Sequence, residues 1–341
     1  MTTDASPKTT MKTTSSSFAR KKYQEILAKL DEIDKGISGF MFRLSLPPMV
    51  EAVYSVPANF FGLVPSLAIF PLWIALLALE DGLVPTDEQT TLGLQRQQQH
   101  HRNVILLKSI TLLSSIGFLV AWVSFQKGYM PLTKILAQRY CYLLSICFNV
   151  GLLSYTLLQL PLDDPYAASS KKAFSLAIYL LFLWPPCILI VVILKEFSQR
   201  TRPIVLDTTR SGDSTSSDRW LDKKAFPNIC YFLARAQANE SFPSGDAASA
   251  AIFAILLVNI APRYTTPAWS ILVLACTGRM YVLAHYFFDV VAGSILACVI
   301  HRVASSVGLG IYDMQWWHPF ASTMVLATYI KTMMKNKRKI G

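Results

Sequence analysis

Long apolar runs constrain the fold of this chain more than any other feature of its sequence. A membrane core of ~30 Å is crossed by a helix of roughly 20 apolar residues. Only helices and closed barrels satisfy all their backbone polar groups in lipid, and runs of this length favour helices. We therefore expect an all-α polytopic transmembrane helical bundle with six to eight crossings. The candidate spans are 58–79, 104–125, 141–160, 174–194, 247–262, 268–284 and 288–309.

The composition agrees with a membrane protein and excludes several other classes. Hydrophobic residues make up 52% of the 341 residues and charged residues 16%, which argues against disorder, collagen repeats or a solvated coiled coil. The net charge of +11 would suit nucleic acid on a soluble face, but much of it lies between apolar runs. We therefore expect membrane lipids and an anionic substrate as partners, and no nucleic acid. The cysteines lie mostly inside the apolar runs without C-x-x-C spacing, and so are predicted to be buried thiols, not metal ligands.

The ends of the chain differ from its apolar middle. Residues 1–17 are rich in Thr, Ser and Lys and are predicted to be a disordered tail without a signal-peptide core. Residues 18–100 hold an amphipathic helix, expected at an interface or docking surface, and an additional hydrophobic segment. Residues 101–310 form the predicted membrane core, and residues 311–341 a basic cytoplasmic tail. The apolar stripe of the amphipathic helix consists of Tyr23, Leu27, Leu30, Ile33 and Ile37.

Basic residues predict the orientation. Lys331, Lys335 and the final KRKIG place the C-terminus in the cytoplasm by the positive-inside rule. Three predicted crossings separate this tail from the hydrophilic connection at 196–242, so that connection is expected to face the lumen or exterior. The final residues also resemble a dilysine retrieval signal, which suggests the endoplasmic reticulum.

Polar residues at the mouth of a membrane bundle are costly, and here they form three clusters. Because successive spans alternate in direction, all three clusters fall on the same face of the predicted bundle. They can therefore converge on one site. The clusters are Lys195 with Arg202 and Pro203; Pro243, Ser244, Gly245 and Asp246; and Arg279, His285 and Asp289.

Together these clusters have the chemistry of a phosphate site. Arg and Lys match the charge of a phosphoryl group, and a helix start at Ser244 and Gly245 would add backbone N–H donors. His285 and Asp289 are four residues apart, so the carboxylate could hold one ring nitrogen and leave the other free to attack. Taken singly, Lys195 would be a snorkelling lysine and Asp246 the N-cap of the next helix. His285 with Asp289 could also be a satisfied polar pair.

The joint pattern resembles the type-2 phosphatidate phosphatase and vanadium haloperoxidase superfamily, whose motifs are K-x6-R-P, P-S-G-H and S-R-x5-H-x3-D. Here they correspond to Lys195–Pro203, Pro243–Asp246 and Gly278–Asp289, within a resemblance that covers roughly residues 100–310. The resemblance implies a six-helix phosphatase core, acting without a metal or cofactor. It also implies a phosphohistidine at His285, oriented by Asp289. The residues implied to hold the phosphoryl group are Lys195, Arg202 and Arg279, beside the backbone donors expected at Ser244 and Gly245.

Two positions depart from the family pattern. Gly278 replaces a Ser, which we expect to be tolerated. Asp246 replaces the His that protonates the leaving group, a step worth roughly 10²–10⁴-fold in rate. Nearby cations and the helix start should keep Asp246 ionised, making it a poor acid. His100, His101, His301 and His318 are expected on the opposite face and cannot replace it.

The substitution at Asp246 shapes the expected activity. We expect a lipid phosphate or isoprenoid diphosphate phosphatase, with diphosphates favoured because their leaving group needs little protonation. Asp246 remains in the catalytic set with His285 and Asp289. A lipid phosphotransferase, or a catalytically silent member that binds lipid phosphate, remains as an alternative.

Overall fold

The computed structural model describes residues 14–51, 69–81, 167–209, 220–225, 240–313 and 317–340, with isolated positions at 315 and between 54 and 116. Regular structure in these residues is entirely helical. The predicted spans at 104–125 and 141–160 lie mainly or wholly outside the described residues. The α-helices are α1 (Thr14–Arg43), α3 (Phe70–Asp81), α6 (Ala167–Ser198), α7 (Pro203–Thr209), α9 (Gly245–Ile260), α10 (Thr265–Tyr281), α11 (Phe287–Ser306) and α12 (Trp317–Ile340), and short 3-10 helices are η3 (Leu221–Lys223), η4 (Pro262–Tyr264) and η5 (Ile311–Asp313).

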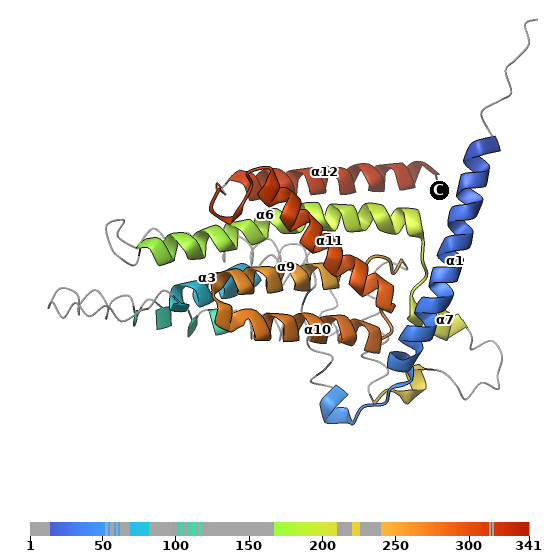
Figure 1. Cartoon of the computed structure of the whole chain (residues 1–341), viewed down its shortest axis with the longest axis horizontal. Helices are drawn as coiled ribbons and strands as arrows, with labels where there is room; N and C mark the ends of the chain where they lie inside the picture. The colour runs from blue at the N-terminus through green and yellow to red at the C-terminus, as the bar shows by residue number, and fades with distance from the viewer. Residues whose placement is uncertain are drawn as a thin grey trace, which may run out of the picture.

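The helices α3, α6, α9, α10, α11 and α12 form a bundle, and α1 and α7 lie across one of its ends (Figure 1). Both α10 and α11 pack on α9, while α3 and α12 pack on α6. Alanines on α9, including Ala247, Ala250 and Ala254, are buried in the interior. Such small side chains let neighbouring helices approach closely, as membrane bundles require.

Among the described residues, two helices are long and apolar enough to cross a membrane. They are Lys171–Ser198 of α6 and Phe287–Ser306 of α11, which coincide with the predicted windows 174–194 and 288–309. The apolar helix α9 has 16 residues and falls short of this length, and α10 has 17. The all-α class is thus confirmed for the described residues, with two candidate spans among them.

The amphipathic helix expected over 18–37 is present as α1, a longer helix of 30 residues. Its apolar stripe faces outward, with Leu30, Ile33 and Ile37 all exposed. A neighbouring face of the helix is buried and includes Asp34 and Ser38, both 0% exposed. The helix therefore packs on the bundle through these polar side chains and through buried Phe42, and leaves Leu30, Ile33 and Ile37 uncovered.

Helices also occupy parts of the chain that the sequence suggested were connections. The hydrophilic stretch 196–242 contains α7 and η3. After residue 313, α12 packs along α6 and runs back toward the end of the bundle where α1 and α7 lie (Figure 1).

Candidate active site

The three polar clusters meet at the end of the bundle that α1 covers. Nη2 of Arg279, in the last turn of α10, lies 2.8 Å from Oδ2 of Asp246, in the first turn of α9. The backbone N–H of Ser244 donates to the carbonyl of Asp289, in the first turn of α11, at 2.9 Å. These contacts tie the start of α9 to both neighbouring helices.

Gly293 permits this close approach of α9 and α11. A Cβ atom at position 293 would lie 2.2 Å from the carbonyl oxygen of Ser244, a distance that no side chain can occupy. Gly293 is four residues after Asp289 and so lies one turn further along the same face of α11. The glycine therefore determines how near the second cluster lies to Asp289.

His285 lies in the turn between α10 and α11 and is 0% exposed. The turn includes Leu283, whose φ of 58° is left-handed, a strained conformation for a leucine. Nδ1 of His285 lies 2.8 Å from the carbonyl oxygen of Ser241. Because a carbonyl only accepts, Nδ1 carries the hydrogen in this contact. The neutral ring therefore has its free lone pair on Nε2.

Nε2 of His285 is buried and has no hydrogen-bond partner among the described residues. Burial lowers the pKa of His285 well below its usual 6.5, and the charges of Arg202, Arg279 and Lys195 lower it further. The imidazole is therefore neutral at pH 7. A neutral ring with an unpartnered nitrogen beside three cations has the properties of a nucleophile for an anionic substrate.

Asp289 is close to His285 but does not hold it in the predicted way. Its Oδ2 lies 3.6 Å from Nδ1 of His285, beyond hydrogen-bond distance, and accepts instead from the N–H of Tyr286 at 2.9 Å. The carbonyl of Ser241 takes the orienting hydrogen bond. Asp289 therefore acts on the imidazole through its charge in this arrangement.

Each of the three predicted cations is tethered to a backbone carbonyl. Nη1 of Arg202 donates to Ala284 and Nη1 of Arg279 to Ala58, both at 3.1 Å, and Nζ of Lys195 donates to Glu240 at 3.1 Å. Arg202 and Arg279 are 0% and 1% exposed. A carbonyl fixes the direction of a cation without neutralising it. Even with the pair between Arg279 and Asp246, the three cations leave the cluster a net positive charge for an anion.

The start of α9 differs from the sequence expectation in two details. Ser244 is the N-cap, with Oγ accepting from the N–H of Ala247 at 3.3 Å, so the N-cap interpretation of Asp246 is wrong. The backbone N–H of Ser244 is used by Asp289 and does not face a ligand. Its hydroxyl hydrogen, and the N–H of Gly245 at the first helical position, are the donors this segment can offer.

Arg200 is the most important residue that sequence reasoning missed. Its Nη1 lies 2.6 Å from Oδ1 of Asp289 and 2.7 Å from Oδ2 of Asp34, and its Nε donates to Asp31 at 2.8 Å. The guanidinium also lies over the ring of Tyr286, 4.0 Å from its centroid. The spacing of Asp31, Asp34 and Ser38 along one face of α1, beside its apolar stripe, was the available signal.

Gly278, the first departure from the family pattern, has a steric explanation. A Cβ there would lie 2.8 Å from the Cβ of Ala58, whose carbonyl accepts from Arg279. Ala58 therefore occupies the space that a serine would need.

His301 and His318 have their contacts outside the site. Nδ1 of His301 lies 2.8 Å from the hydroxyl of Tyr179, and His318 bonds the backbone of Gln315 near the start of α12. His301 is near the end of α11 and His318 near the start of α12, and these helix ends lie at the other end of the bundle from α7 (Figure 1). No group of three His, Cys, Asp or Glu side chains suited to a metal occurs in the part of the chain that the structure describes.

Comparison with known proteins agrees with the motif assignment. Residues 173–310 match the family model described as the PAP2 superfamily. The matched residues include all three clusters. No curated protein and no solved structure matched the chain.

Proposed function

Because residues 173–310 are a PAP2 superfamily domain, which implies phosphatase-type chemistry on phosphate esters, we propose that this protein is an integral membrane phosphatase of lipid phosphates or diphosphates. The observation that carries the proposal is the buried, unpartnered Nε2 of His285 among Lys195, Arg202 and Arg279. A neutral nucleophile surrounded by fixed positive charge suits attack on a phosphoryl group and little else.

The proposed reaction has two displacements. The lone pair on Nε2 of His285 attacks phosphorus in line, the bond to the leaving oxygen breaks, and a phosphohistidine forms. Lys195, Arg202 and Arg279 hold the equatorial oxygens, with the hydroxyl of Ser244 and the N–H of Gly245 as further donors. Water then attacks the phosphohistidine, releasing inorganic phosphate and restoring the lone pair of His285.

Asp246 directs the proposal toward diphosphates. Its carboxylate is held by Arg279 at 2.8 Å, at the position where the family motif has the histidine that protonates the leaving group. A diphosphate leaves as a phosphate monoester, whose second pKa of ~6 requires little protonation, whereas an alkoxide requires an acid. We therefore propose an isoprenoid or other lipid diphosphate as the better substrate.

The two apolar helices long enough to span a membrane support a membrane location. An endoplasmic reticulum membrane, a lumenal site and a cytoplasmic C-terminus stay predictions. The helix α12 is relevant to the predicted cytoplasmic C-terminus. It packs along α6 and runs back toward the end of the bundle that holds the site (Figure 1).

A phosphate-release panel tests the activity. Purified full-length protein is assayed on a prenyl diphosphate, a prenyl monophosphate and a phosphatidate, with His285→Ala as the inactive variant and His301→Ala as the matched control. We expect release that is fastest on the diphosphate, lost in His285→Ala and kept in His301→Ala. Equal rates on diphosphate and phosphatidate would contradict the role given to Asp246.

The same panel separates the alternatives. Transfer of phosphate to an added lipid alcohol would identify a phosphotransferase. No release from any substrate, combined with activity in Asp246→His, would show that the natural protein is a silent binder of lipid phosphate.

A further inference from the structure

A cavity of about 610 Å³ lies between α1 and α11, beside the candidate active site. Its volume falls in the range of roughly 300–1,000 Å³ that is typical of small-ligand sites. Two helical stripes form its long walls. On α11 they are Phe288, Val291, Ala292 and Ile295, and on α1 Ala28, Leu30, Asp31 and Lys35.

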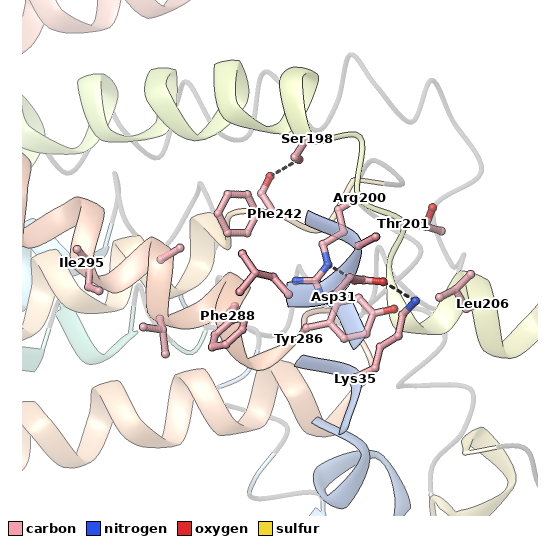
Figure 2. Close-up of a pocket in the computed structure, with 14 residues that line it drawn as sticks. Asp31, Lys35, Ser198, Arg200, Thr201, Leu206, Phe242, Tyr286, Phe288 and Ile295 are labelled. Atoms are coloured by element: carbon pink, nitrogen blue, oxygen red, sulfur yellow. Dashed lines mark hydrogen bonds and ion pairs between the residues drawn. The ribbon is translucent and has the colours of Figure 1, made fainter. Parts of the chain in front are cut away.

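The charged lining residues gather at one end of this cavity. Figure 2 shows Arg200, Asp31 and Lys35 together near Tyr286, while Ile295 lies well away from them along α11. From Phe288 to Ile295 a helix advances ~10 Å, so the apolar wall of α11 leads away from the charged end. The cavity is therefore amphipathic along its length.

The charged end adjoins the proposed phosphate site. Arg200 lines the cavity and also contacts Asp289 at 2.6 Å. Tyr286 lines it and directly follows His285 in the chain, and Phe242 lines it and directly follows Ser241, whose carbonyl holds His285. A ligand with its phosphate among the cations would have its remaining atoms beside this cavity.

The rims of the cavity are exposed apolar surfaces. Ile295 is 57% exposed and continues on α11 into exposed Val299 and Val303. Leu30 is 42% exposed and belongs to the outward stripe of α1 with Ile33. Since α11 is a candidate membrane span, its exposed face is the one that would meet lipid. The cavity can thus be entered from the hydrocarbon.

The volume indicates how much chain it holds. A methylene group takes up about as much room as a water molecule, ~30 Å³. A cavity of about 610 Å³ therefore has room for a lipid chain of many methylenes.

We propose that the cavity between α1 and α11 binds a single alkyl or isoprenyl chain of the phosphorylated substrate, which makes α1 part of the substrate site. The inference rests on the proposed function and narrows it to single-chain lipid phosphates and diphosphates. The matched family domain begins at residue 173, so α1, which forms one wall of the chain site, lies outside it, while α11, which forms the other wall, lies inside it.

The kinetic test fills the cavity without touching the catalytic residues. Ala292→Trp places an indole in the cavity, and Val299→Trp places one on the exposed face of the same helix, seven residues later. We expect Ala292→Trp to raise KM for a long-chain alkyl diphosphate about tenfold and to leave kcat/KM for a short, water-soluble alkyl diphosphate unchanged. Val299→Trp should change neither value. Equal effects of both variants, or of Ala292→Trp on both substrates, would overturn the proposal.

Substrate comparison tests the single-chain claim. We expect a higher kcat/KM for a single-chain lipid phosphate than for a diacyl phosphatidate in the same detergent. Equal values, unchanged by Ala292→Trp, would show that the chain does not enter this cavity.

A binding measurement keeps this inference separate from the proposed function. A non-hydrolysable single-chain phosphonate with a mid-chain diazirine is photo-crosslinked to the full-length protein in nanodiscs, and the adducts are mapped by mass spectrometry. We expect adducts within 28–35 and 288–295, retained in His285→Ala and lost in Ala292→Trp. Adducts in these two segments without phosphate release would contradict the proposed reaction but support the chain site. Adducts confined to other segments would contradict the chain site but leave the proposed reaction standing.

Discussion

The guanidinium of Arg200 holds the carboxylate of Asp289, with Nη1 2.6 Å from Oδ1. The same nitrogen lies 2.7 Å from Oδ2 of Asp34, so a helix outside the family domain is joined to the candidate active site. Oδ1 of Asp34 also accepts the N–H of Phe288 at 3.0 Å, at the start of α11. Two carboxylates, on α1 and α11, thus share one cation.

Removing the charge of Asp34 should weaken catalysis through Arg200. Asp34→Asn keeps an oxygen that can accept the N–H of Phe288 but removes the ion pair between Asp34 and Arg200. Arg200 then neutralises more of the charge of Asp289, which lies beside His285. We expect kcat to fall about tenfold with little change in KM, and stability to fall by about 1.5–3 kcal/mol, the range for a hydrogen bond to a charged group. The measurements are steady-state kinetics and thermal unfolding.

Asp31→Asn is the matched control for that prediction. Asp31 also contacts Arg200, but its side chain is 28% exposed and it does not bond α11 in any contact of the described residues. We expect a smaller change in kcat. An effect as large as that of Asp34→Asn would show that the loss is general weakening of α1.

Filling the space at Gly293 should separate α9 from α11. Gly293→Ala puts a Cβ 2.2 Å from the carbonyl oxygen of Ser244, so the contact between Ser244 and Asp289 must open. Overpacking of this kind costs typically about 1–3 kcal/mol. We expect a lower melting temperature and loss of activity. Gly245→Ala is the control, since its Cβ would meet Ile188 at an ordinary 3.5 Å, and its melting temperature should match that of the natural protein.

The buried imidazole should make stability depend on pH. The pKa of folded His285 is lowered well below the 6.5 of an exposed histidine. Protonation therefore favours the unfolded state, and the contribution of His285 to stability, full above pH 6.5, is lost as the pH falls toward the lowered value. We expect acidification from pH 7 to pH 5 to destabilise the natural protein more than His285→Gln in detergent melts. Parallel curves for the two proteins would contradict this.

Two tags can show whether the connection at 196–242 and the C-terminus lie on opposite sides of the membrane. One is inserted at residues 210–219 and one at the C-terminus, and each is tested for protease access in sealed microsomes. The positive-inside prediction places them on opposite sides. Tags on the same side would show that α12 crosses together with α6.

The sequence alone was enough to recognise the family, because its motifs are local patterns. The spacing between Arg279, His285 and Asp289, and the position of Ser244 before an apolar helix, depend only on residues that are neighbours in the chain. The family assignment made from these motifs is confirmed over residues 173–310. The apolar runs likewise predicted α6 and α11, because hydrophobic length is a local property.

Tertiary structure alone decided which groups hold these residues in place. The carbonyl of Ser241 orients His285 from 44 positions away, and Asp34 meets Arg200 across 166 positions. No local pattern determines such contacts, since they arise only when packed helices bring distant segments together and buried charges must find partners. For the same reason, the outward stripe of α1 was visible in the sequence, whereas the function of its buried polar face depended on the neighbours that folding supplied.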